Sequence, residues 1–346
     1  SGIFGGIGIA GFVASGTTGF TSATGISGFV SGNVGTAIGS GDGAAGLRSG
    51  TAGGTLGIAG GAAGVAISAA GATVEDNLIG VDADGAAPLG EVGGGVLTLS
   101  PDTTITGNTV RAESVAVLVV TPEATGAQVT GNRIGVAQGS ATPLADQGRG
   151  IRIDGTPGAT VSGNVVVADG AAEAGIEVIG GVQTTQDDEG NLFLNSSVAS
   201  DDVPVTGGTA TVAGNVVGAA AIGAEPLDEP TRFGILVWDE APEVTVSANT
   251  VAGVTQRAVK VEGGAGHRIV GNHLGVDTGG GEQPVPGGID LFGTPDTVIG
   301  EIGAGNDVLT EGTAVASSGP SSLTIAGNEL THAGGDEGLG LFVGPG

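Results

Sequence analysis

The side chains best suited to chemistry lie in short segments of the form Gly/Ala–apolar–x–apolar. When these segments are aligned, Asp154 and Glu177 fall on neighbouring copies. A glycoside hydrolase uses two carboxylates about 5–10 Å apart. Asp154 and Glu177 are therefore the candidate catalytic pair of a polysaccharide hydrolase, although acids also occur on adjacent repeats by chance.

The same alignment gives a candidate ligand-binding surface. Arg152 occupies position x of its segment, and two positions onward Trp238, Glu262 and Phe292 follow one another in successive copies. If the segments are adjacent strands, the two aromatic rings are roughly 10 Å apart and flank a carboxylate. Such rings can stack on sugars while the charged groups bind hydroxyls. The alternative is a small apolar patch, exposed or covered by a loop or second subunit.

Charge restricts the choice of partner. The chain has 36 acidic residues but only nine Lys plus Arg, for a net charge of −27. A lyase needs cations to neutralise the carboxylate of a uronate, and the chain has few basic side chains that could do this. Phosphate backbones and anionic lipids are repelled, so we expect no nucleic-acid binding. Residues 1–14 are apolar but too short and glycine-broken to span a bilayer, so we expect no membrane insertion.

One acidic turn has the composition of a calcium loop. Asp82 and Asp84 stand in Asp-Ala-Asp-Gly, and calcium prefers several carboxylate and carbonyl oxygens at close range. The rest of an EF-hand is missing, and the related loops lack the second aspartate. Calcium is thus the only cofactor that the sequence suggests, and a solvated acidic loop is the alternative.

These residues are positioned by a repeat built on asparagine. A β-branched pair, a small residue and asparagine recur along the chain, ending at Asn77, Asn108, Asn132, Asn164, Asn215, Asn249, Asn272 and Asn328, and Asn306, in GAGNDVL, falls in step with them. Asparagine tolerates a left-handed backbone at a turn, and stacked amides can hydrogen-bond to one another. We therefore expect a structural asparagine ladder, with all nine residues at equivalent turns.

The spacing of the asparagines predicts an all-β solenoid. Successive asparagines are separated by 22–34 residues, with one gap of 51 that contains an acidic insertion at about 183–207. Each unit has short period-2 segments separated by glycine-rich turns, which is typical of stacked coils. The longer coils carry a loop that we expect to project from one side. Opposite charges at Arg152/Glu177 and Lys260/Asp290 would pair across neighbouring strands. An insertion folded over these strands would wall a groove.

The coil motif resembles a known architecture. The matching segments begin with Gly-Asn-x-apolar-Gly or a variant of it and occur at 76–89, 131–144, 214–227 and 271–285. They resemble right-handed parallel β-helix proteins of the pectate-lyase-like superfamily, in particular surface proteins whose coils read G-N-x-I-G. The resemblance covers about residues 64–346 and implies a β-helix there. Residues 1–63, rich in Gly and Ala, are expected to form further coils or a cap.

Fold and composition together favour a non-catalytic role. The resemblance implies an extracellular or cell-surface protein, and the absence of cysteine is compatible with export because a laddered solenoid needs no disulfides. Solenoid ends expose unpaired strand edges, so self-association into a filament, appendage or spike, or adhesion to other surface proteins, is expected. The alternative is a polysaccharide-binding or polysaccharide-degrading protein that uses the face near Asp154, Glu177 and Trp238.

Overall fold

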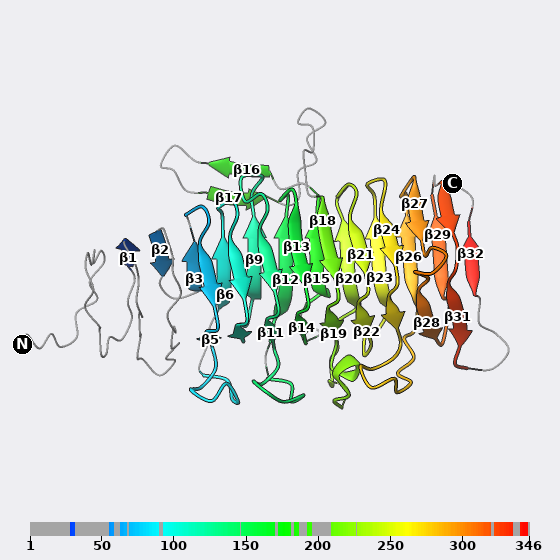
Figure 1. Cartoon of the computed structure of the whole chain (residues 1–346), viewed down its shortest axis with the longest axis horizontal. Coiled ribbons are helices and arrows are strands. Elements are labelled where there is room, and N and C mark those ends of the chain that lie inside the picture. The colour runs from blue at the N-terminus through cyan, green and yellow to red at the C-terminus, as the bar shows by residue number, and fades with distance from the viewer. Residues whose placement is uncertain are drawn as a thin grey trace, which may run out of the picture.

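The computed structural model describes residues 63–67, 69–89, 93–145, 147–169, 172–180, 209–225, 227–319, 322–334 and 340–344, and the backbone of strands β1, β2, β16 and β17 outside these ranges. Three sheets run side by side along the molecule, and the chain passes through them in turn (Figure 1). Successive strands within each sheet pair in parallel from β3 onward. The predicted all-β fold is confirmed as a parallel β-helix.

Sheet 1 contains β1 (Gly28–Ser31), β2 (Thr55–Ile58), β3 (Ala63–Ile67), β6 (Gly94–Thr98), β9 (Val115–Val120), β12 (Arg149–Asp154), β15 (Ala174–Ile179), β20 (Phe233–Trp238), β23 (Arg257–Glu262), β26 (Ile289–Phe292), β29 (Val315–Ser318) and β32 (Leu341–Val343). Sheet 2 contains β4 (Thr73–Glu75), β7 (Thr104–Thr106), β10 (Gln128–Thr130), β13 (Ala159–Ser162), β18 (Ala210–Ala213), β21 (Thr245–Ser247), β24 (Arg268–Val270), β27 (Thr297–Ile299) and β30 (Leu323–Ile325). Sheet 3 contains β5 (Leu78–Ile79), β8 (Thr109–Val110), β11 (Arg133–Ile134), β14 (Val165–Val166), β19 (Val216–Val217), β22 (Thr250–Val251), β25 (His273–Leu274), β28 (Asp307–Thr310) and β31 (Glu329–His332).

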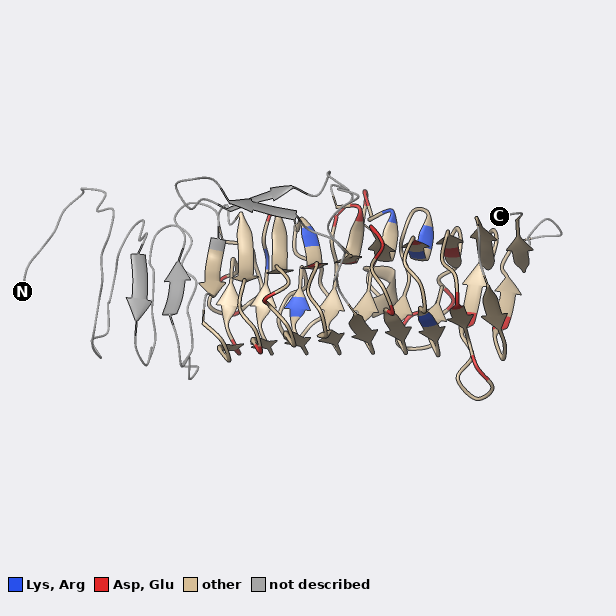
Figure 2. Ribbon diagram, turned by 90° about the horizontal axis from the view of Figure 1, so that it is seen from above, with Lys and Arg blue, Asp and Glu red and all other residues tan. Residues whose placement is uncertain are grey.

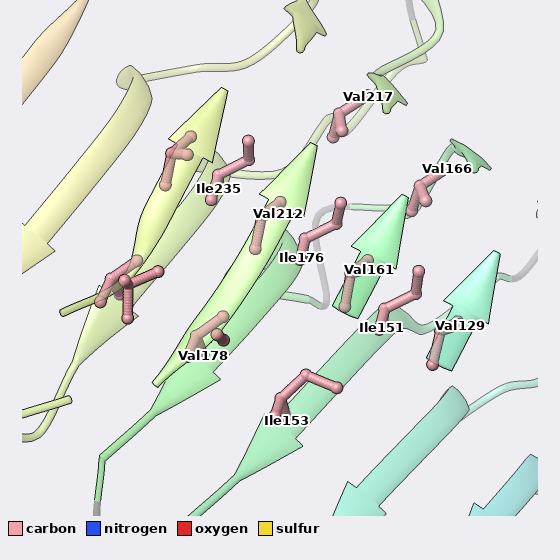
Figure 3. Packing of buried hydrophobic residues seen from close by; sticks show 14 of the residues in the cluster. Val129, Ile151, Ile153, Val161, Val166, Ile176, Val178, Val212, Val217 and Ile235 are labelled. Atoms are coloured by element: carbon pink, nitrogen blue, oxygen red, sulfur yellow. The ribbon is translucent and has the colours of Figure 1, made fainter. Parts of the chain in front are cut away.

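The core fills the narrow space between the three sheets. In one coil, Ile151 and Ile153 point inward from sheet 1, Val161 from sheet 2 and Val166 from sheet 3, and all are buried (Figure 3). β-Branched residues suit such a pleated surface. Where sheets 1 and 3 meet there is no room for a side chain larger than that of alanine, and at Gly150 even a Cβ would lie 2.3 Å from Val166. The Gly/Ala that opens each sheet 1 segment is therefore a packing requirement.

The predicted asparagine ladder is confirmed. Each Nδ2 donates to the Oδ1 of the asparagine in the next coil, at 2.8–3.0 Å, from Asn77 through to Asn328. The backbone N–H of each asparagine donates to the same oxygen. The ladder lies at the turn between sheets 2 and 3 and is buried except at Asn328. It therefore fixes the register of nine consecutive coils.

We expected the asparagine to adopt the left-handed conformation, but at every ladder turn except that of Asn306 it is the preceding residue that does so. Gly131 has φ 66° and Gly214 has φ 64°, and Asp76 and Ala248 adopt the same conformation at φ 53°. Glycine enters this region without the steric cost of a side chain. The asparagine is selected for its amide, and the preceding glycine for its backbone.

The second glycine of G-N-x-I-G is required for a different structural reason. Gly135 has φ 65°, and a Cβ there would lie 1.9 Å from the carbonyl oxygen of Val167 in the next coil. A Cβ on Gly218 would lie equally close to the carbonyl oxygen of Ala252. These glycines turn the chain out of sheet 3 into the long loops. The short coils continue without such a turn.

The long loops form a ridge on one side, as predicted. They follow Asn77, Asn132, Asn215 and Asn272 and extend beyond the ends of the sheet 3 strands (Figure 1); the third contains the 3-10 helix η1 (Ala220–Ile222). Loops on alternate coils contact each other over the short coil between them. The N–H of Gln138 donates to the oxygen of Gly85 at 2.8 Å, and that of Thr278 to the oxygen of Ala221 at 2.9 Å.

Two predicted regions lie mostly outside the described residues. Within 1–62 only β1 and β2 are described. They pair antiparallel with each other, and β2 pairs antiparallel with β3, unlike the parallel strands that follow. Within the 183–207 insertion only β16 (Gln183–Gln186) and β17 (Leu192–Asn195) are described, as an antiparallel pair. The insertion leaves between β15 and β18, so it interrupts a single coil.

Candidate functional site

The outward face of sheet 1 brings three of the predicted site residues together. Arg152 lies opposite Glu177 in the parallel pairing of β12 with β15, and Asp154 follows two positions along β12. Arg152 Nε donates to both oxygens of Asp154 at 2.9 Å, and Arg152 NH1 lies 3.6 Å from Glu177 Oε2. One guanidinium therefore links both candidate carboxylates.

Arg149 completes this cluster, and the sequence analysis did not include it among the site residues. It precedes Arg152 by three residues on β12, and its Nε lies 3.3 Å from Glu177 Oε1. A small irregularity explains the omission: Gly150 and Ile151 are both buried, so Arg149 returns to the outward face with Arg152. Strict alternation places Arg149 inward, and the sequence carries no signal that reveals the irregularity; in the structure Arg149 pairs in register with Val115.

Burial dominates the electrostatics of the cluster. The side chains of Asp154 and Glu177 are only 2% and 3% exposed. Loss of hydration raises the pKa of Asp154, and the hydrogen bond from Arg152 only partly offsets this. Burial likewise raises the pKa of Glu177, against the attraction of Arg152 and Arg149. Glu177 Oε1 and Trp238 Nε1 are buried without a hydrogen-bond partner.

These properties decide what the cluster can do. A raised carboxyl pKa suits a general acid, and such groups occur at catalytic sites. A glycosidase acid must also reach the bridging oxygen of a polymer. Asp154 and Glu177 expose almost no surface and bind the same arginine, so the described geometry suits a structural ion cluster better than an acid–nucleophile pair.

The predicted aromatic column is in register but unevenly exposed. β20 pairs with β23, and Glu262 lies opposite Phe292 in the pairing of β23 with β26. Trp238 is half-buried and packs against Phe233 and Leu236, whereas Phe292 is 59% exposed. Only one of the two rings is thus largely free to stack on a ligand.

The ion pairs near this column differ from the predicted ones. Lys260 lies opposite Asp290, as expected, but its ammonium contacts Glu262 on its own strand. Asp290 is instead 3.7 Å from Arg257. Lys260 Nζ also lies 4.9 Å from the centroid of the Phe233 ring. A buried aromatic ring attracts an ammonium, which holds Lys260 toward β20 and away from Asp290.

The predicted calcium residues have a role within their loop. Asp82 Oδ1 accepts hydrogen bonds from the N–H groups of Ala86 and Ala87 at 2.7 and 3.2 Å, and these bonds lower the pKa of Asp82. Asp277 forms the equivalent turn in its own loop. Asp84 is exposed. Among the described residues, no group of three or more His, Cys, Asp and Glu side chains is arranged to hold a metal ion.

Nothing in the described part of the chain forms a helix long and apolar enough to cross a membrane. Comparison with known proteins adds no assignment: no family model, no curated protein and no solved structure matches the chain.

Proposed function

We propose that the chain is a non-catalytic structural or adhesive β-helix protein that acts outside the cell, as a subunit of a surface filament, an appendage or a spike. The observation that supports this most is that the same three strands and the same asparagine recur through nine coils. The groups that could do chemistry serve this stack: buried carboxylates bind arginines, and Asp82 closes a loop.

The proposal includes a family and a location. The chain resembles right-handed parallel β-helix proteins of the pectate-lyase-like superfamily, and G-N-x-I-G surface proteins in particular, through motifs in which both glycines have a structural reason. An extracellular or cell-surface location agrees with a chain that contains no cysteine and joins its coils by backbone and amide hydrogen bonds.

Self-association has a candidate surface at the C-terminal end of the solenoid. Within the described residues β32 pairs only with β29, and Leu341, Phe342 and Val343 are about half exposed. The unpaired edge of an apolar strand can pair with a strand of another chain. End-to-end contacts of this kind build open fibres rather than closed rings.

Imaging of the purified protein by electron microscopy tests the proposal. Filaments are expected, and Phe342→Glu should shorten or abolish them by placing a charge on the end strand. Ile302→Glu is the matched control, because Ile302 is 95% exposed on the turn between β27 and β28 and does not belong to β32. Absence of filaments from the unmodified protein would count against a filament subunit.

A polysaccharide hydrolase or lyase is the alternative, favoured by the raised pKa values of Asp154 and Glu177. Screening against neutral and acidic polysaccharides distinguishes the two functions. We expect no turnover, and we expect Asp154→Ala and Glu177→Ala to leave assembly intact. Depolymerisation that disappears in either variant would establish the enzyme instead.

A further inference from the structure

One area of sheet 1 differs in charge from the rest of the molecule. Its outward side chains come from β20, β23 and β26 and from the residues that precede β15 and β20, and we call it the balanced face. Its charged residues form three ion pairs: Arg232–Glu173, Arg257–Asp290 and Lys260–Glu262. Three basic residues thus cancel three acidic ones.

The balance is notable because basic residues are scarce. Arg149 and Arg152 lie on the same side of sheet 1 and are paired with Asp154 and Glu177. Five of the nine basic residues therefore lie along one face, each with an acidic partner, and the net charge of −27 is carried entirely by the rest of the chain. Acidic segments extend along the length of the molecule, whereas basic ones are few (Figure 2).

The balanced face also carries an exposed aromatic residue. Phe292 lies opposite Glu262 at the end of β26 and is 59% exposed, the largest exposure of any aromatic side chain among the exposed large hydrophobic residues of the described part. The charged side chains of the face are also partly exposed: Lys260 and Glu262, beside Phe292, expose 23% and 40% of their side chains. An exposed aromatic ring beside partly hydrated ion pairs is typical of protein interfaces.

We propose that two copies of the chain pack side by side through the balanced face. Two molecules of net charge −27 repel each other over most of their surfaces. The three ion pairs of this face carry no net charge and present both signs, so a two-fold axis can bring basic groups of one copy to acidic groups of the other. Phe292 supplies exposed apolar area at the end of β26. This lateral contact is separate from the end-to-end contact through β32.

The test compares the full chain with two variants that add the same charge. Phe292→Glu removes the exposed ring and unbalances the face, whereas Ile302→Glu adds a glutamate at a site that is 95% exposed elsewhere. Sedimentation velocity over a range of concentrations measures the mass, and circular dichroism verifies folding. We expect lateral pairing of the unmodified chain and of Ile302→Glu, with association at least about tenfold weaker in Phe292→Glu.

Other occupants of the face give different results. If residues 181–208 of the same chain or a carbohydrate occupy it, the unmodified chain does not pair laterally and the proposal is overturned. Equal association of both variants overturns it as well. If the protein forms filaments, paired rods that become single rods in Phe292→Glu support the lateral contact. Persistent pairing in that variant refutes the contact without affecting the proposed filament role.

Discussion

Each asparagine of the ladder uses its amide and its backbone N–H at once. The N–H and Nδ2 of Asn215 both donate to Asn249 Oδ1, Nδ2 also donates to the oxygen of Val161 at 2.9 Å, and Oδ1 accepts two bonds from Asn164. All of these groups lie in the interior, where a polar group without a partner costs about 1–3 kcal/mol. The ladder is therefore strong only while it is complete.

Asn215→Ala should lower the free energy of unfolding by about 3 kcal/mol or more, since it leaves several buried donors and acceptors without partners. Asn328→Ala is the control at the end of the ladder. Asn328 is only partly buried, so water can replace its bonds and the expected loss is about 1 kcal/mol. Urea unfolding followed by circular dichroism measures both. Equal losses would mean that the ladder contributes no more inside the stack than at its end.

His267 gives stability a dependence on pH. Its Nδ1 accepts from the N–H of Val244 at 3.3 Å and its Nε2 lies 3.1 Å from the oxygen of Gly263, which suits the neutral ring with its proton on Nε2. Burial lowers the pKa of His267, although Glu240 partly opposes this. The unfolded chain takes up the proton at pH about 6.5 and the folded chain only at lower pH. The contribution is therefore complete above pH 6.5 and is lost as the pH falls below it.

His267→Asn should remove this dependence. Urea unfolding between pH 5 and 8 should give a shallower fall in stability toward acid than in the unmodified protein. The raised pKa values of Asp154 and Glu177 act in the opposite direction, because acid neutralises those buried carboxylates, but they do so equally in both proteins. Parallel profiles for the two proteins would exclude His267 as the source.

At the scale of the element, one ridge loop contains two glycines whose replacement should destabilise the protein for different reasons, one by backbone strain alone and one by strain and a steric clash. Gly135 and Gly139 both have positive φ, at 65° and 70°. A Cβ on Gly135 would strike the oxygen of Val167 at 1.9 Å, whereas a Cβ on Gly139 would meet nothing within 4 Å. Gly139→Ala should cost about 1 kcal/mol through backbone strain alone.

Gly135→Ala should cost at least about 3 kcal/mol, since it adds a clash between coils to the same strain. Thermal unfolding of the pair measures the difference, and the conformational cost is common to both. Similar midpoints would show that the coils move apart at this corner without penalty.

The sequence predicted those elements that have the same packing requirement in every coil. The asparagine spacing placed the turns and the long loops correctly, because each coil must stack on the last. Local exceptions were not predicted: Arg149, which faces outward through an irregularity at Gly150, was not among the site residues, and Lys260 contacts Glu262 beside the ring of Phe233 instead of Asp290. The burial of Asp154 and Glu177 was also unpredictable, since a repeat pattern does not reveal which outward positions become covered.

For the whole molecule, the two ends of the described β-helix differ. Near its beginning Asn77 and Ile79 are buried, with exposures of 3% and 0%. At its C-terminal end Leu323, Ile325 and Leu330 are only partly buried, and β32 is about half exposed. Each coil of a solenoid is stabilised mainly by its neighbours, and among the described strands β30, β31 and β32 each pair on one side only. Unfolding should begin there.

Hydrogen exchange measured by mass spectrometry should therefore give a gradient along the chain. Amides of β30, β31 and β32 should exchange at least about tenfold faster than those of β12 and β15, because opening one end coil breaks a single interface whereas opening an inner coil breaks two. Amides of β4 and β5 should stay protected with the inner coils, since their coil is buried. Equal protection from β4 to β31 would instead mean that the β-helix opens as one cooperative unit.

Filament formation through β32 should slow exchange at the C-terminal coil first and leave the inner coils unchanged.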